Sequence, residues 1–85
     1  MEDDRLRIDK FLKNSRIIKR RTVAKEACEQ GRVFINDSLA KPGDVVKVGD
    51  IVKVNFAANT IKIRVLSVDD NVKKEDATKL YEYID

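Results

Sequence analysis

The chain has 85 residues, 42% of them hydrophobic, and a net charge of +3, which suits one small domain. It has no histidine and a single cysteine, Cys28, so an intramolecular disulfide and a Cys/His zinc site of the usual kind are both excluded. No apolar run approaches the roughly 18 residues that cross a membrane, and the acidic start lacks the apolar stretch of a secretion signal, so we expect a cytoplasmic protein without membrane contact.

Positive charge is concentrated near the start of the chain. Residues 5–25 hold nine lysines and arginines against one acid, Asp9, which gives a local net charge of +8. A concentrated cationic surface on a small domain is typical of proteins that bind a phosphate backbone. The alternative is a basic face that is only solvated.

Two helices are predicted before Gly31. Ile8, Phe11 and Leu12 have the spacing of one apolar stripe on a short first helix. A second helix is predicted from about Arg21 to Gln30, and its inner face is expected to contain Val23, Ala24, Ala27 and Cys28. Gly31 follows where the left-handed backbone of a helix end favours glycine.

After Gly31 the spacing changes to that of short strands. Residues 33–35 and 38–40 are predicted to pair around Asn36-Asp37, two residues that tolerate turn geometry. Turns centred near Gly43 and Gly49 lead to further strands.

Strands are predicted at residues 51–56 and 60–65, where apolar and polar residues alternate. Phe34 and Phe56 are expected in the core.

The tail from Lys73 to Tyr83 has helical spacing, and its docked stripe is expected to contain Ala77, Leu80, Tyr81 and Ile84. Two helices, four or five strands and a short C-terminal helix predict an α+β fold with an antiparallel or mixed sheet. We expect one domain over residues 1–85.

The sequence offers no convincing catalytic residue. Asp9 has no carboxylate partner nearby, so we expect it to hold a neighbouring arginine in position. Cys28 falls on the apolar face of the second helix, where a buried inert thiol is expected. The sequence therefore predicts a protein that is not an enzyme and needs no cofactor or metal.

A helix pair would gather the cations of residues 5–25 onto one surface, and the planar fork of arginine matches phosphate well. These candidate RNA-binding residues are Arg5, Arg7, Lys10, Lys13, Arg16, Lys19, Arg20, Arg21 and Lys25.

Four segments, in this order and spacing, resemble the RNA-binding module first named for small-subunit ribosomal protein four, the S-four domain. They are residues 7–12, 21–24, 31–36 and 48–52. The resemblance covers about residues 5–56, followed by a C-terminal strand and helix over 60–85. It implies a helix pair packed on a small, strongly curved sheet, with the helices docked on structured RNA.

The resemblance also implies which positions contact RNA. It places Arg7, Lys10, Arg21, Lys25 and Arg32 at these contacts, with Lys19 and Arg20 beside them. Many members have Ser or Thr where Arg20 stands, as the cap of the second helix. How this helix is capped is therefore left open.

Along nearly its full length, the chain resembles stand-alone members of the family that act in ribosome-associated quality control. This implies three partners: rRNA of the large ribosomal subunit, peptidyl-tRNA, and an RqcH-like factor that adds C-terminal alanine tails. We expect a monomer.

Two alternatives remain. One is a heat-shock-type factor that recycles blocked large subunits; its longer basic C-terminal extension is not expected here, because this chain ends in acidic sequence. The other is a basic module that binds an acidic protein.

Overall fold

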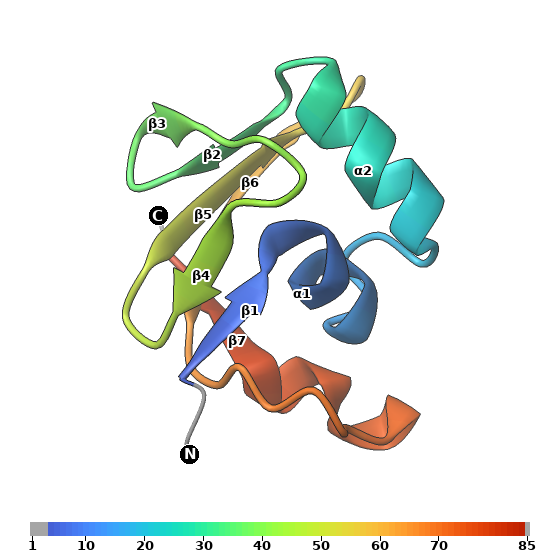
Figure 1. Cartoon of the computed structure of the whole chain (residues 1–85), viewed down its shortest axis with the longest axis vertical. Helices are drawn as coiled ribbons and strands as arrows, with labels where there is room; N and C mark the ends of the chain where they lie inside the picture. The colour runs from blue at the N-terminus through green and yellow to red at the C-terminus, as the bar shows by residue number, and fades with distance from the viewer. Residues whose placement is uncertain (1–3, 85) are drawn as a thin grey trace.

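The computed structural model describes residues 4–84, so the first three residues, with most of the acidic start, and Asp85 lie outside the described range. Two short helices pack against antiparallel strands (Figure 1), which confirms the α+β fold class. The elements in chain order are β1 (Arg5–Arg7), α1 (Ile8–Asn14), α2 (Arg21–Glu29), β2 (Val33–Ile35), β3 (Ser38–Leu39), β4 (Val45–Lys47), β5 (Ile51–Asn55), β6 (Thr60–Val65), the 3₁₀ helix η1 (Lys74–Leu80) and β7 (Tyr81–Tyr83). In this part of the chain, no helix is long and apolar enough to cross a membrane.

The two helices lie against each other through the apolar faces that the sequence predicts (Figure 1). On α1, Ile8, Phe11 and Leu12 are fully buried. On α2, the small residues Ala24 and Cys28 are buried, and small side chains at a helix contact let the two backbones approach closely. Val23 was expected on this inner face, but its side chain is 46% exposed.

One sheet carries most of the core. Its strand order is β3-β2-β5-β6-β7, and every neighbouring pair is antiparallel. The buried residues alternate along the strands, as in the register pairs Val33 with Val54 and Val52 with Ile63. This face of the sheet and the helix pair enclose a single hydrophobic cluster.

A second, two-stranded sheet was not predicted. β1 leads directly into α1 and pairs antiparallel with β4, with Leu6 opposite Val46 and both side chains buried. The backbone N–H of Ile8 then donates to the carbonyl of Asp44 at 2.7 Å. These contacts fix where α1 begins relative to the rest of the molecule, so the prediction of four or five strands undercounts the seven within residues 4–84.

The β2–β3 hairpin has the turn that its sequence predicts. Asn36 and Asp37 have φ of 51° and 69°, the left-handed values that a tight two-residue hairpin needs. The Asn36 amide also holds a second turn, because its Oδ1 accepts from the N–H of Ile51 and its Nδ2 donates to Asp50.

The helix predicted over residues 73–83 is confirmed as a short 3₁₀ helix, but the prediction is wrong for its last three residues. The 3₁₀ helix ends at Leu80, the backbone of Tyr81 is extended, and β7 pairs with β6. Ala77 and Leu80 are buried as expected. Extending the sheet satisfies backbone groups at the edge of β6, which a continued helix would leave without protein partners.

Two aromatic residues expected in the core lie elsewhere. Phe34 alternates with Val33 and Ile35, so the pleat directs it to the outer face, where the ammonium of Lys53 lies 4.5 Å from its ring centroid. Phe56 follows the last residue of β5 and is 36% exposed.

Candidate nucleic-acid interface

Five of the candidate cations gather around two adjoining surface hollows. Arg5, Arg7, Lys10 and Arg21 line one hollow, and Arg7, Arg21 and Lys25 line the other. The two hollows therefore share Arg7 and Arg21 and form one continuous surface. We call these five residues the cationic face.

The cationic face combines side chains from three elements. Arg5 and Arg7 come from β1, Lys10 from α1, and Arg21 and Lys25 from α2. Arg21 and Lys25 are one helical turn apart and so share a side of α2. The unpredicted pairing of β1 with β4 places the two strand arginines beside the helices.

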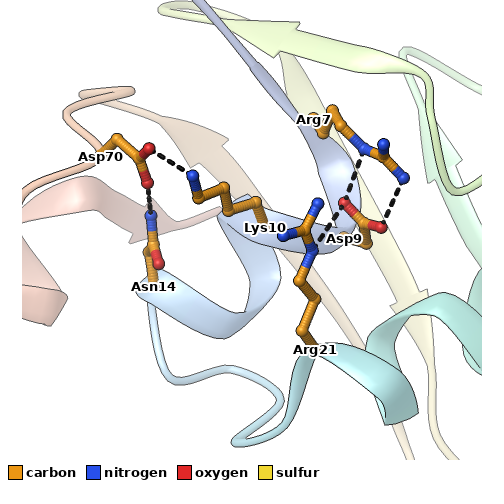
Figure 2. A network of polar contacts seen from close by, with 6 residues as sticks. All are labelled: Arg7, Asp9, Lys10, Asn14, Arg21 and Asp70. Atoms are coloured by element: carbon orange, nitrogen blue, oxygen red, sulfur yellow. Dashed lines mark hydrogen bonds and ion pairs between the residues drawn. The ribbon is translucent and has the colours of Figure 1, made fainter.

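Asp9 holds two of these arginines (Figure 2). Its carboxylate is almost fully buried and accepts hydrogen bonds from Arg7 Nε at 3.2 Å and Arg7 Nη2 at 2.9 Å. Arg21 Nε lies 3.6 Å from Asp9 Oδ1. This confirms the expectation that Asp9 positions a neighbouring arginine, and it adds a second one.

The two arginines remain available to a ligand although they are anchored. Their side chains are about half exposed. A guanidinium has five N–H donors in a fixed fork, so those not used on Asp9 can bind phosphate. Asp9 thus fixes the orientation of two forks, which lowers the entropy lost when an anion binds.

Lys10 has a partner that sequence reasoning missed. Its Nζ lies 2.5 Å from a carboxylate oxygen of Asp70, and Asn14 Nδ2 donates to the other oxygen at 2.9 Å (Figure 2). These hydrogen bonds, from Lys10 first and Asn14 second, lower the pKa of Asp70 below its ordinary value. Asp70 lies in the loop after β6, far from α1 in sequence, and no local pattern links the two.

The remaining cations of residues 5–25 lie at the end of α1 and in the loop that follows it. Lys13 is at the end of α1, and Arg16, Lys19 and Arg20 are in the loop to α2; all four are exposed. Arg16 has a left-handed backbone, with φ of 64°. None of the four lines the hollows of the cationic face, so this loop forms a second basic segment beside it.

Helix α2 begins without a side-chain cap. Arg20 occupies the N-cap position with an extended backbone and makes no side-chain cap hydrogen bond. Its carbonyl still accepts from the N–H of Ala24 at 3.0 Å. The position that a Ser or Thr would use for capping therefore carries charge instead.

Arg32 lies apart from the other candidates. It follows α2 and lines a different hollow, together with apolar residues of α2 and β5. The structure therefore does not bring Arg32 into the cationic face.

The thiol of Cys28 does not contribute reactive chemistry. Burial and the nearby carboxylate of Asp9 raise its pKa to about 11, so it stays protonated at neutral pH. Among residues 4–84, no group of three or more acidic or cysteine side chains is placed to hold a metal ion. What the cationic face offers is oriented positive charge.

Comparisons with known proteins agree with this arrangement. The family model described as "S4 domain" matches residues 6–52, from the middle of β1 through both α-helices and strands β2 to β4 into the start of β5. The chain is 51% identical over 77 residues to the "RQC P-site tRNA stabilizing factor" of Halalkalibacterium halodurans, covering 91% of this chain and 88% of that protein. The factor of the same name from Streptococcus pneumoniae is 49% identical over 79 residues, covering 93% and 90%.

A solved structure is similar over almost the whole chain. It is the trimeric structure of heat shock protein 15 from Vibrio cholerae, with a TM-score of 0.85 and 27% sequence identity, covering 94% of this chain and 82% of that one. The segment matched by the family model contains four of the five residues of the cationic face, all except Arg5. The family match, the relatives and the fold agree. The chain belongs to the S4 domain family.

Proposed function

We propose that this chain is a non-enzymatic RNA-binding factor of ribosome-associated quality control. It binds rRNA and peptidyl-tRNA on obstructed large ribosomal subunits and stabilises the tRNA in the P site. In this way it supports C-terminal alanine tailing by an RqcH-like partner. It acts as a monomer in the cytoplasm.

The observation that carries the proposal is the cationic face within a chain about half identical to two P-site tRNA stabilizing factors. Arg7 and Arg21 are oriented by a buried carboxylate and keep free donors on their exposed sides. Fixed guanidinium forks suit the phosphates of structured RNA, whose path is itself fixed.

Two sets of residues would contact RNA differently. The cationic face binds phosphates where β1, α1 and α2 meet. The basic segment of Lys13, Arg16, Lys19 and Arg20 extends the contact along the α1–α2 loop. Two contact regions suit a factor that touches both rRNA and tRNA. Arg32 belongs to neither region.

The test is gradient sedimentation of the tagged protein from cells at low and high salt, with sequencing of the RNA in each fraction. We expect the protein to migrate with large subunits that carry tRNA and to be released at high salt, because phosphate contacts release counterions. Migration as free protein at low salt would contradict the proposal. Association that survives ribonuclease would favour the basic protein-interaction module instead.

A heat-shock-type role on blocked large subunits is the second candidate, and the similarity to the Vibrio cholerae structure favours it. Deleting the gene separates the two roles. Loss of alanine tails from stalled chains is expected for the quality-control role, whereas unchanged tails with slow clearance of subunits after heat shock are expected for the other.

A further inference from the structure

A separate hollow of about 200 Å³ lies between α2, the loop before it and the end of β5. The turn after β5 emerges behind the C-terminal part of α2 in Figure 1, and residues of both segments line the hollow. Val23 and Ala27 of α2, with Gln30 at its C-cap, form a different stripe from Arg21 and Lys25. The hollow is therefore distinct from the cationic face.

The lining has an apolar floor and an apolar mouth. Ile18 and Val54 are buried beneath it, while Val23 and Phe56 are 46% and 36% exposed. Large apolar side chains left exposed together around a concave surface mark an interaction site more often than scattered ones do. The volume is below the roughly 300–1,000 Å³ of pockets for drug-sized ligands, so it suits one small planar group.

The rim carries unused hydrogen-bonding groups. In the described part of the chain, the side chains of Gln30 and Arg32 have no hydrogen bond or ion pair. Asn55 Oδ1 accepts from the Thr60 hydroxyl at 3.0 Å, which leaves its Nδ2 to donate. Glu26 adds a carboxylate, which repels phosphate but accepts from an exocyclic amino group.

The hollow is continuous with the basic α1–α2 loop. Ile17 and Ile18 line it, and their sequence neighbours Arg16 and Lys19 are exposed cations. A nucleic-acid strand whose phosphates contact this loop passes beside the hollow. An aromatic wall, an arginine and amide groups around an apolar slot are the groups that receive an unstacked base.

We propose that this hollow receives a single unpaired nucleobase of the bound RNA, with Phe56 as the stacking wall and Gln30, Arg32 and Asn55 reading its edge. The proposal rests on the RNA binding proposed above. An apolar side chain of a protein partner fits less well, because it would bury the rim groups without hydrogen bonds, which is costly.

The test uses the full chain and two fluorescent RNAs, a hairpin with an unpaired loop containing each of the bases and a fully paired duplex with the same stem. We expect Phe56→Ala to weaken binding to the hairpin about tenfold, from the loss of one stacked base, and to leave duplex binding unchanged. Phe56→Tyr should retain hairpin affinity. Gln30→Ala, at the exposed C-cap position of α2, should weaken hairpin binding about fivefold through a lost hydrogen bond.

Leu39→Ala is the matched control, because Leu39 is 58% exposed and does not line the hollow. Equal hairpin affinity of the wild type, Phe56→Ala and Gln30→Ala would overturn the base site and leave RNA binding intact. Loss of large-subunit association by Phe56→Ala with unchanged hairpin binding would point to a protein occupant and also overturn it. A wild type that binds neither RNA would overturn the proposed function itself.

Discussion

Asp9 is the residue on which the geometry of the cationic face depends. It is 1% exposed, and its only ion-pair partners within residues 4–84 are Arg7 and Arg21. A buried carboxylate that loses all partners is strongly destabilising, whereas the loss of one of two partners is tolerated better. Arg7 and Arg21 therefore stabilise the fold by pairing with Asp9, in addition to offering donors to a ligand.

We expect Arg7→Ala to lower the free energy of unfolding by about 1–2 kcal/mol, because it removes two hydrogen bonds to the buried Asp9 carboxylate, donated by a guanidinium that is half open to solvent. Arg21→Ala should lower the free energy of unfolding by less, since the distance from Arg21 Nε to Asp9 Oδ1 is longer. The double variant should lose about 3–5 kcal/mol, more than the sum, because the buried carboxylate is then unpaired. Urea denaturation measures all three, and Lys19→Ala is the control. Small additive losses would show that Asp9 does not couple the arginines.

Cys28 gives a prediction for alkaline pH. Its folded pKa is about 11 against an ordinary 9.0, so between these values the folded state holds a proton that the unfolded state loses. Stability from this thiol is fully present below about pH 9 and falls as the pH rises through 11. Subtracting the melting curve of Cys28→Ala isolates the effect from lysine and tyrosine titration. A difference in stability between wild type and Cys28→Ala that stays constant from pH 9 to 11 would refute this prediction.

At this scale the sequence is informative where partners are near each other along the chain. Asp9 is the one acid among nine cations and lies two residues from Arg7, so its role could be predicted. The role of Asp70 could not be predicted, because its contact with Lys10 depends on how the loop after β6 returns to α1. Phe34 was misplaced because alternation along a strand does not state which face is buried.

Among the elements, α2 begins without a side-chain cap. We expect Arg20→Ser to raise the free energy of unfolding by about 1 kcal/mol, because Arg20 already has the extended N-cap backbone that a capping serine uses. The same change should weaken RNA binding by removing a cation. Thermal melting and RNA titration measure the two effects. An Arg20→Gln variant is the control, since it removes the charge without providing a good cap, and equal stability of the two variants would contradict the capping explanation.

The loop after β6 is linked to α1 through Asp70. We expect Asp70→Asn to tighten RNA binding a few-fold, because Lys10 becomes free to bind a phosphate. The slope of the logarithm of the affinity against the logarithm of salt should become steeper by about 0.7–0.9. Stability should fall by less than about 1 kcal/mol, since the pair is exposed. Because the pKa of Asp70 is lowered, this loss appears above the ordinary value of 3.8 and vanishes as the pH falls through the lowered pKa.

Asp69→Asn is the matched control for Asp70→Asn. Asp69 is the neighbouring acid and accepts from the N–H of Asn71 instead of contacting the cationic face. The two variants have the same net charge. Equal effects of both on RNA binding would show that Asp70 acts through overall charge and not through Lys10.

The elements with strong local patterns, α1, α2 and the β2–β3 hairpin, could be predicted because helical periodicity and a turn dipeptide are local signals. β1 and β4 have three residues each, and only their pairing with a distant partner defines them. Over residues 73–83, Ala77 and Leu80 have helical spacing and are buried, but the open edge of β6 decides that the chain is extended from Tyr81.

Over the whole molecule, charge is divided between two regions. Residues 5–25 carry +8 in a chain of net +3, so the rest of the protein carries −5. Cations concentrated in one stretch of the chain raise the local positive potential, which attracts a polyanion more strongly than a net charge of +3 spread evenly would. The sequence predicts the charge and its location near the start, but the convergence of three elements into one face follows only from the fold.

The most direct test of phosphate binding by the cationic face is the affinity for purified large ribosomal subunits as a function of salt, for the wild type, Lys25→Gln and Lys62→Gln. Lys25 lines the cationic face, and Lys62 lies on β6 opposite Lys53, outside it. We expect the logarithm of the affinity to fall linearly with the logarithm of salt, with the slope reduced by about 0.7–0.9 in Lys25→Gln and unchanged in Lys62→Gln. Affinity independent of salt, or equal slopes for the two variants, would contradict binding through this face.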